Sequence, residues 1–235
     1  IQANMNPRHR DRAVFVRIVS GVFERDMQVI DQRSGKKVRL ANAQKLFGQD
    51  RETLDTAYAG DILALVGNYN FLIGDTLTSD PKVVYDEMPR FTPECFTYIR
   101  NSDTTNIKRY RAGIEQLMKE GVAQSYFLHG SIERVPLLGA VGPLQFEVLQ
   151  ARLISEYQVE TRLEHSPWSL VQWLEEKEPD TMRRDMDPPK VLLPSGCSIA
   201  RDQDGNWVVL LGSKYLVASL HERNEHLTFR DHAND

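Results

Sequence analysis

The chain has 235 residues, a formal net charge of −4 at pH 7, and 41% hydrophobic and 26% charged residues. This composition is ordinary for a globular protein and excludes a chain that is disordered throughout. The sequence has no run of about 18 apolar residues and no signal peptide at its N-terminus, so we expect no membrane association. The net acidity argues against general coating of nucleic acid, but it leaves room for local phosphate contacts.

The two cysteines, Cys95 and Cys197, lie far apart in the chain. Such isolated thiols make neither a zinc knuckle nor a disulfide framework, and they fit a reducing cytosol. We therefore expect a cytoplasmic protein. The chain begins at Ile1 in what reads as the middle of a strand, so we also expect a missing upstream region.

Residues 1–85 have the pattern of a small all-β barrel. Short apolar runs alternate with turn dipeptides such as Ser34–Gly35, Gly60–Asp61 and Gly74–Asp75. The predicted strands cover 13–20, a strand pair within 22–32 that turns at Arg25–Asp26, and then 37–40, 62–66 and 76–78. Many short strands with turn signals every eight to twelve residues, roughly, are typical of such barrels.

Residues 86–235 are predicted to form an α+β domain. A strand at 96–100 precedes a helix from about Thr105 to Glu120, and Gly121 follows where a left-handed cap belongs. Strands at 122–128 and 135–141, a helix to about Tyr157 and a strand at 158–163 complete the pattern. This order is the split βαβ arrangement of ferredoxin-like domains.

The remainder of the chain is predicted as a C-terminal extension without an assigned topology. Its elements are a strand at 168–174, two apolar strands at 197–200 and 207–211, a helix at 213–223 and a strand at 227–229. The chain as a whole is therefore predicted to be α+β.

The sequence contains no recognisable catalytic constellation. It has no phosphate-binding loop, no dinucleotide fingerprint, no nucleophile elbow and no paired zinc-binding histidines. Three of the six histidines, His221, His226 and His232, lie close together, but their spacing does not place two imidazoles on one helical face. We expect them at the surface, and we expect neither a catalytic nor a metal site in this chain.

Two basic clusters are candidates for phosphate contacts. Arg8, His9, Arg10 and Arg12 fall in a predicted loop between the first two strands. On charge alone, a solvated hairpin loop is the slightly better interpretation. The second cluster, Lys108 to Arg111, opens an amphipathic helix, so its charges are expected to face water.

Four stretches together resemble translational GTPases, and among them the bacterial class II peptide chain release factors. They are IQANMNPRHRDRAVFVRIVSGVFERDMQV at 1–29, AYAGDILALVG at 57–67, FLIGDTL at 71–77 and GAVGPLQFEVLQARLISEYQVE at 139–160. The first two resemble the second domain of such factors, and the last resembles the third. Asp26 departs from the family pattern at a turn that usually holds glycine, and aspartate tolerates positive φ better than most residues.

The resemblance implies an upstream GTPase domain that binds GTP or GDP and Mg, so this fragment would not be an enzyme although the full-length protein would be a GTPase. It implies a ribosome-binding and relay module, contacting small-subunit RNA and protein, in a monomeric factor that promotes dissociation of class I release factors after termination. Arg8, His9, Arg10 and Arg12 would then form an interface with ribosomal RNA or with the GTPase domain. The sequence does not choose between these two.

Relay of a nucleotide-dependent change requires rigid domains. The expected core residues are Val14, Val16, Ile18, Ile62 and Leu65 in the barrel, and Ile114, Leu117, Leu144, Leu149 and Leu153 in the ferredoxin-like domain. The alternatives are the same module from an elongation-factor or ribosome-protection GTPase, a non-catalytic RNA- or protein-binding module, and a free-standing enzyme. The lack of a catalytic constellation counts against the enzyme.

Overall fold

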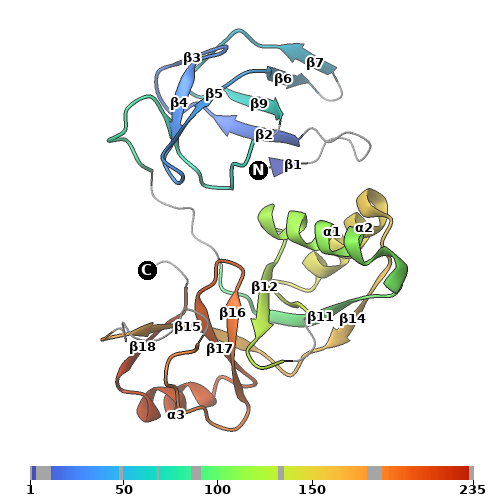
Figure 1. Ribbon diagram of the computed structural model, residues 1–235, viewed down its shortest axis with the longest axis vertical. Helices are drawn as coiled ribbons and strands as arrows, with labels where there is room; N and C mark the ends of the chain where they lie inside the picture. The colour runs from blue at the N-terminus through green and yellow to red at the C-terminus, as the bar shows by residue number, and fades with distance from the viewer. Residues whose placement is uncertain are drawn as a thin grey trace. The chain divides into compact units, whose positions relative to one another are not determined.

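The computed structural model describes residues 2–3, 12–47, 50–67, 69–85, 91–131, 135–178 and 187–232. The chain forms two compact units, Ile1–Met88 and Pro89–Asp235 (Figure 1). No helix among the described residues is long and apolar enough to cross a membrane.

The first unit is a small all-β barrel, as the sequence predicts. Its strands are β1 (Gln2–Ala3), β2 (Arg12–Arg17), β3 (Val22–Glu24), β4 (Gln28–Asp31), β5 (Lys36–Arg39), β6 (Ala43–Phe47), β7 (Asp50–Thr53), β8 (Thr56–Tyr58), β9 (Ile62–Gly67) and β10 (Leu77–Thr78). They form sheets in the orders β1-β2-β9-β6-β7, β10-β4-β5 and β3-β8. All the pairs are antiparallel.

The barrel core confirms most of the predicted residues. Val14 and Leu65 are buried, and Val16 and Ile18 pack against the same cluster. The prediction that Ile62 belongs to the core is wrong, because its side chain is 62% exposed. It occupies the first position of β9, and the buried part of that strand begins at the next residue.

Two features of the barrel differ from the prediction. The strands within 22–32 do not pair with each other: β3 pairs with β8, whereas β4 pairs with β5 and β10. The sequence analysis also assigned no strands to the polar segment that forms β6, β7 and β8. The turn at Arg25–Asp26 is confirmed, and Asp26 adopts a left-handed φ of 65°.

The second unit begins with the ferredoxin-like arrangement. Its elements are β11 (Cys95–Asn101), a 3-10 turn at Thr104–Asn106, α1 (Ile107–Lys119), β12 (Gln124–Leu128), β13 (Leu137–Ala140), α2 (Leu144–Tyr157) and β14 (Thr161–His165). The strand order β14-β11-β13-β12 is that of a split βαβ domain. The predicted fold of this part is confirmed.

The end of α1 follows from the glycine at position 121. Gly121 has a φ of 72°, its N–H donates to the carbonyl of Met118, and the N–H of Val122 donates to the carbonyl of Leu117. This pair of bonds is the Schellman motif, in which a left-handed residue satisfies the last carbonyls of a helix. The predicted left-handed cap is confirmed.

The strand predicted at 158–163 begins later than expected. Gln158 adopts the left-handed region at the end of α2, and its N–H donates to Ile154. The chain is therefore still completing the helix cap at this position. The strand begins only at Thr161.

The C-terminal extension continues the same sheet. Its elements are β15 (Leu170–Glu176), β16 (Cys197–Asp202), β17 (Trp207–Leu211), α3 (Leu216–Arg223) and β18 (Leu227–Arg230). β16 pairs with β12, so the sheet has the order β14-β11-β13-β12-β16-β17-β15-β18. The ferredoxin-like part and the extension thus form one sheet of eight strands (Figure 1).

The two faces of this sheet bury different cores. On one face, α1 and α2 pack on Ile99, Leu138 and Ala140, and α3 packs on Val209 and Leu211. The other face buries the aromatic cluster around Tyr126 and Trp173. We call these the helix face and the aromatic face.

Candidate functional site

The arginine loop lies largely outside the residues that the structure describes. Arg8, His9 and Arg10 are among the residues that are not described, and Arg12 is described only as the first residue of β2, where its backbone pairs with Gly67. The interface role of these four residues therefore stays a prediction.

The strands on either side of this loop are described. β1 pairs antiparallel with β2, with Gln2 opposite Val14 and Ala3 opposite Ala13. β2 in turn pairs with β9 along its whole length. The loop therefore joins two neighbouring strands, as the sequence predicts.

The second basic cluster lies where the sequence predicts. Lys108, Arg109 and Arg111 are exposed on the first turns of α1, whereas Tyr110 between them is buried. The guanidinium of Arg109 donates to the side-chain oxygen of Gln158 at 3.2 Å. These charges face water, as expected.

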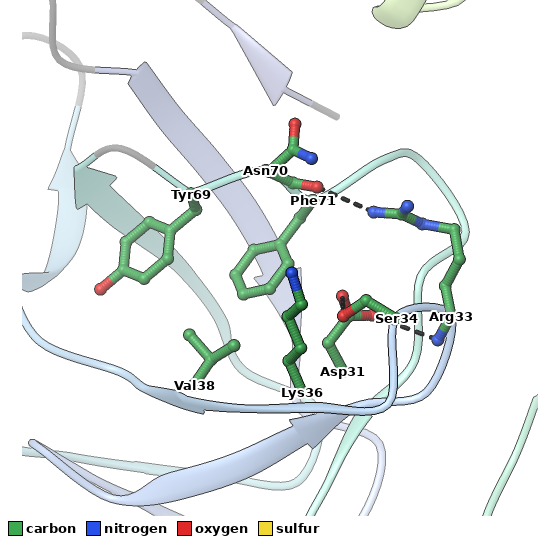
Figure 2. A pocket seen from close by; sticks show the side chains of 8 residues that line it. All are labelled: Asp31, Arg33, Ser34, Lys36, Val38, Tyr69, Asn70 and Phe71. Atoms are coloured by element: carbon green, nitrogen blue, oxygen red, sulfur yellow. Dashed lines mark hydrogen bonds between the residues drawn. The ribbon is translucent and has the colours of Figure 1, made fainter.

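The barrel has a pocket of about 190 Å³ beside strand β5, which the sequence analysis did not predict. Figure 2 shows the rings of Tyr69 and Phe71 on one side of it, and Val38 and Lys36 of β5 across from them. The two rings are stacked with their centroids 5.2 Å apart. The hydroxyl of Tyr69 donates to the carbonyl of Ala41, and burial raises the pKa of Tyr69.

The guanidinium of Arg33 at this pocket is engaged with neighbouring groups of the barrel. The Arg33 guanidinium donates to Asp75 at 2.7 and 3.0 Å and to the carbonyl of Asn70 at 2.8 Å. The hydrogen bond with Asp75 is the main reason why the pKa of Arg33 is raised. Small-molecule sites usually measure about 300–1,000 Å³, so this pocket fits a single side chain or ring and does not fit a nucleoside triphosphate.

The described residues contain no group of three or more His, Cys, Asp or Glu side chains arranged to hold a metal. His221, His226 and His232 instead have separate partners. His221 bonds with Gln172 and stacks on Phe229, His226 bonds with the carbonyl of Lys190, and His232 bonds with Thr92. All three side chains are exposed, so the predicted surface placement of these histidines is confirmed.

A polar network between α1 and α2 was also missed by the sequence analysis. The buried Gln116 side chain donates to Glu120 at 2.9 Å, and Arg152 on α2 donates to both Glu120 and Glu156. Burial alone lowers the pKa of Arg152, but the bonds and charges of Glu156 and Glu120 outweigh it, so the pKa is raised. The network links two helices and has no accessible nucleophile, which indicates a structural role.

The chain matches two sequence families in succession. Residues 85–221 match "Class II release factor RF3, C-terminal domain", and residues 1–80 match "Elongation factor G domain 2". A relative from Gloeobacter violaceus named peptide chain release factor 3 is 42% identical over 98% of this chain. Relatives of the same name from Synechococcus elongatus and Rippkaea orientalis are 50% and 48% identical, each over 74% of this chain.

The chain spans only part of these relatives, 42% of the Gloeobacter protein and 32% of each of the other two. A crystal structure of a protein from Thermus thermophilus has a similar fold, with a TM-score of 0.57 and 18% identity. The match covers 81% of this chain and 28% of that one. The C-terminal family covers more than half of the residues, and the chain therefore belongs to the class II peptide chain release factors.

Proposed function

We propose that this chain is the ribosome-binding and conformational-relay module of a GTP-dependent release factor that promotes dissociation of class I release factors after termination. The observation that carries the proposal is the succession of the two matched families, at 1–80 and at 85–221. The elongation-factor match covers the barrel alone, whereas the release-factor match covers most of the second unit. The second match therefore favours the termination role over an elongation or ribosome-protection role.

Neither the sequence motifs nor the barrel pocket among the described residues supports a GTP site in this chain. The sequence has no phosphate-binding loop, and the barrel pocket of about 190 Å³ is too small for the nucleotide. We therefore assign GTP, GDP and Mg to an upstream domain of the full-length protein, which would be the GTPase. The chain itself would bind and position, in the cytoplasm and as part of a monomeric factor.

Two well-packed units suit this role. A change at a nucleotide site acts on a distant contact only through elements that do not deform. The described residues of the barrel share a buried apolar cluster, and the eight-stranded sheet is packed on both faces. This packing supports the proposed relay.

The release step is tested with the full-length protein on reconstituted post-termination ribosomes that carry a fluorescent class I release factor. We expect GTP-bound protein to accelerate loss of the label. A version truncated before residue 1 of this chain should keep GTP binding and lose the acceleration. Equal acceleration by the truncated version contradicts the relay role.

The arginine loop is tested by ribosome co-sedimentation over a range of salt concentrations. Changing Arg8, Arg10 and Arg12 to Ala should weaken binding and reduce the salt dependence, because each phosphate contact adds about one to the slope. The control removes three charges elsewhere, Lys108, Arg109 and Arg111 to Ala, and should bind as the unmodified protein does. Unchanged binding by the first variant at every salt concentration removes the ribosomal-RNA contact and leaves the GTPase domain as the partner of this loop.

A further inference from the structure

A row of three side chains crosses the helix face of the large sheet. Phe127 of β12 lies opposite Arg201 of β16, and Arg201 lies opposite Trp207 of β17. Directly opposed residues of neighbouring strands point to the same face of a sheet. The row belongs to neither of the apolar clusters that α1, α2 and α3 form with this face, and Phe127 is 43% exposed.

The side chains of this row contact one another through their ring and guanidinium planes. The Arg201 guanidinium carbon lies 4.2 Å from the centroid of the Trp207 ring. The exposed His129 ring meets Trp207 edge-on, with centroids 5.5 Å apart and planes at 79°. We call Phe127, His129, Arg201 and Trp207 the aromatic–arginine row.

Arg201 has no acceptor within the part of the chain that the structure describes. Its buried Nε atom has no hydrogen-bond partner there, and its guanidinium lies against the face of the Trp207 ring. The neighbouring Asp202 does not neutralise it, because Asp202 points to the aromatic face and accepts from Trp173 at 2.9 Å and from Asn206. The row therefore combines π surfaces with a guanidinium whose Nε–H has no acceptor among the described residues.

We propose that the aromatic–arginine row is a binding surface for single-stranded RNA. Unpaired bases stack on aromatic rings and on guanidinium planes, and the phosphates provide the negative charge that Arg201 lacks. A duplex hides its base faces and offers mainly phosphates and sugar hydroxyls, so it would leave the rings unused. The proposal deepens the proposed function, because it names one class of ligand that a ribosome would offer to this module.

The test measures binding of the 235-residue chain to a fluorescein-labelled, unstructured RNA decamer by fluorescence anisotropy. Trp207→Ala and Phe127→Ala should each weaken binding by about fivefold or more, the usual effect of one stacking platform. Trp207→Phe should retain most of the affinity, because the ring remains. Arg201→Ala should weaken binding and lower the salt slope by about one.

Tyr215 is the matched control. It is 84% exposed in the same unit and lies beside a cation, with Lys214 5.8 Å from its ring, but it is not part of the row. Tyr215→Ala should bind the decamer as the unmodified chain does. An equal loss in this control, unchanged binding by the exposed-site variant Phe127→Ala, or no binding by the unmodified chain overturns the proposal.

Two further measurements distinguish RNA binding by the row from binding of an acidic peptide and from the proposed function. Binding of an acidic decapeptide in place of the RNA, with the same dependence on Trp207, overturns the assignment to RNA. Ribosome co-sedimentation with the same variants separates it from the proposed function. If the unmodified chain and the row variants bind ribosomes equally well, this inference fails and the proposed function stands. If the variants bind the decamer more weakly than the unmodified chain does, but the chain does not bind ribosomes, the proposed function fails and this inference stands.

Discussion

Tyr126 and Trp173 have ring centroids 6.4 Å apart, although β16 and β17 lie between their strands in the sheet. In a flat sheet, three strand spacings of about 4.8 Å would separate them by roughly 14 Å. The two side chains therefore lean toward each other over the strands between them and meet within one buried cluster of the aromatic face. Tyr126 and Trp173 are buried in this cluster, which contains no helix residue among those that the structure describes.

Trp173 also anchors the hairpin between β16 and β17. Its indole N–H donates to Asp202, which accepts from Asn206 as well. We expect Trp173→Phe to lower the free energy of unfolding by about 1–3 kcal/mol, because Asp202 stays buried with one donor fewer. Urea denaturation measures the change. Trp207→Phe is the control, since the Trp207 indole donates no hydrogen bond to a residue the structure describes; a larger loss there contradicts this account.

The helix α2 offers a matched pair of leucines. Leu149 is fully buried against the sheet, whereas Leu144, which the sequence placed in the core, is 66% exposed at the first turn. Leu149→Ala should cost about 2–5 kcal/mol, and Leu144→Ala should change stability by less than about 0.5 kcal/mol. Leu149→Asp should misfold. If chemical denaturation showed equal effects for the two alanine variants, the assigned core would be wrong.

Gly113 allows α1 and α2 to approach closely. A Cβ at this position would lie 2.7 Å from a methyl carbon of Leu153 and 3.0 Å from the ring of Tyr157. Gly113→Ala should therefore destabilise by about 1–3 kcal/mol, even though alanine favours helices by about 1 kcal/mol. Gly142→Ala meets no atom within 4 Å and should be tolerated. Thermal unfolding compares the two, and a stabilised Gly113→Ala variant would show that the helices can separate at little cost.

Burial of Tyr110 makes stability depend on alkaline pH. Its hydroxyl donates to the carbonyl of Ile99 at 2.8 Å, and burial raises its pKa from 10.0 to about 12. The folded state thus holds this proton more tightly than the unfolded state, so the stabilisation is present below pH 10 and is lost as the pH rises to about 12. Two pKa units correspond to at most about 2.7 kcal/mol.

The comparison of the unmodified chain with Tyr110→Phe isolates this effect. The variant should lose about 1 kcal/mol at neutral pH through the missing hydrogen bond, and the difference between the two proteins should shrink between pH 10 and about 12. The measurement is the free energy of unfolding in urea at several pH values. A constant difference across that range would exclude Tyr110 as the titrating group.

Local patterns predicted much of the fold. The apolar period of α1, its glycine cap and the split βαβ order were all readable because each depends on neighbouring residues or on short spacings. The errors at Ile62 and Leu144 share a cause: both are the first residue of their element, where the periodic pattern does not report which side is covered.

The candidate functional surfaces could be predicted only in part from the sequence. The arginine loop was visible as a cluster of like charges, and its strands are paired as predicted, but its contacts remain a prediction. The aromatic–arginine row left no signal, because Phe127 lies more than 70 residues before Arg201 and Trp207. Only the strand register makes them neighbours.

The sequence by itself determined the family and the order of its two domains, since these depend on motifs and their succession. The tertiary structure decided how β12 joins β16, which faces the side chains occupy and which cation is left without an acceptor among the described residues. Those properties arise from pairing between strands that are distant in the chain. No local propensity encodes such pairing, because its free energy comes from long-range packing and backbone hydrogen bonds.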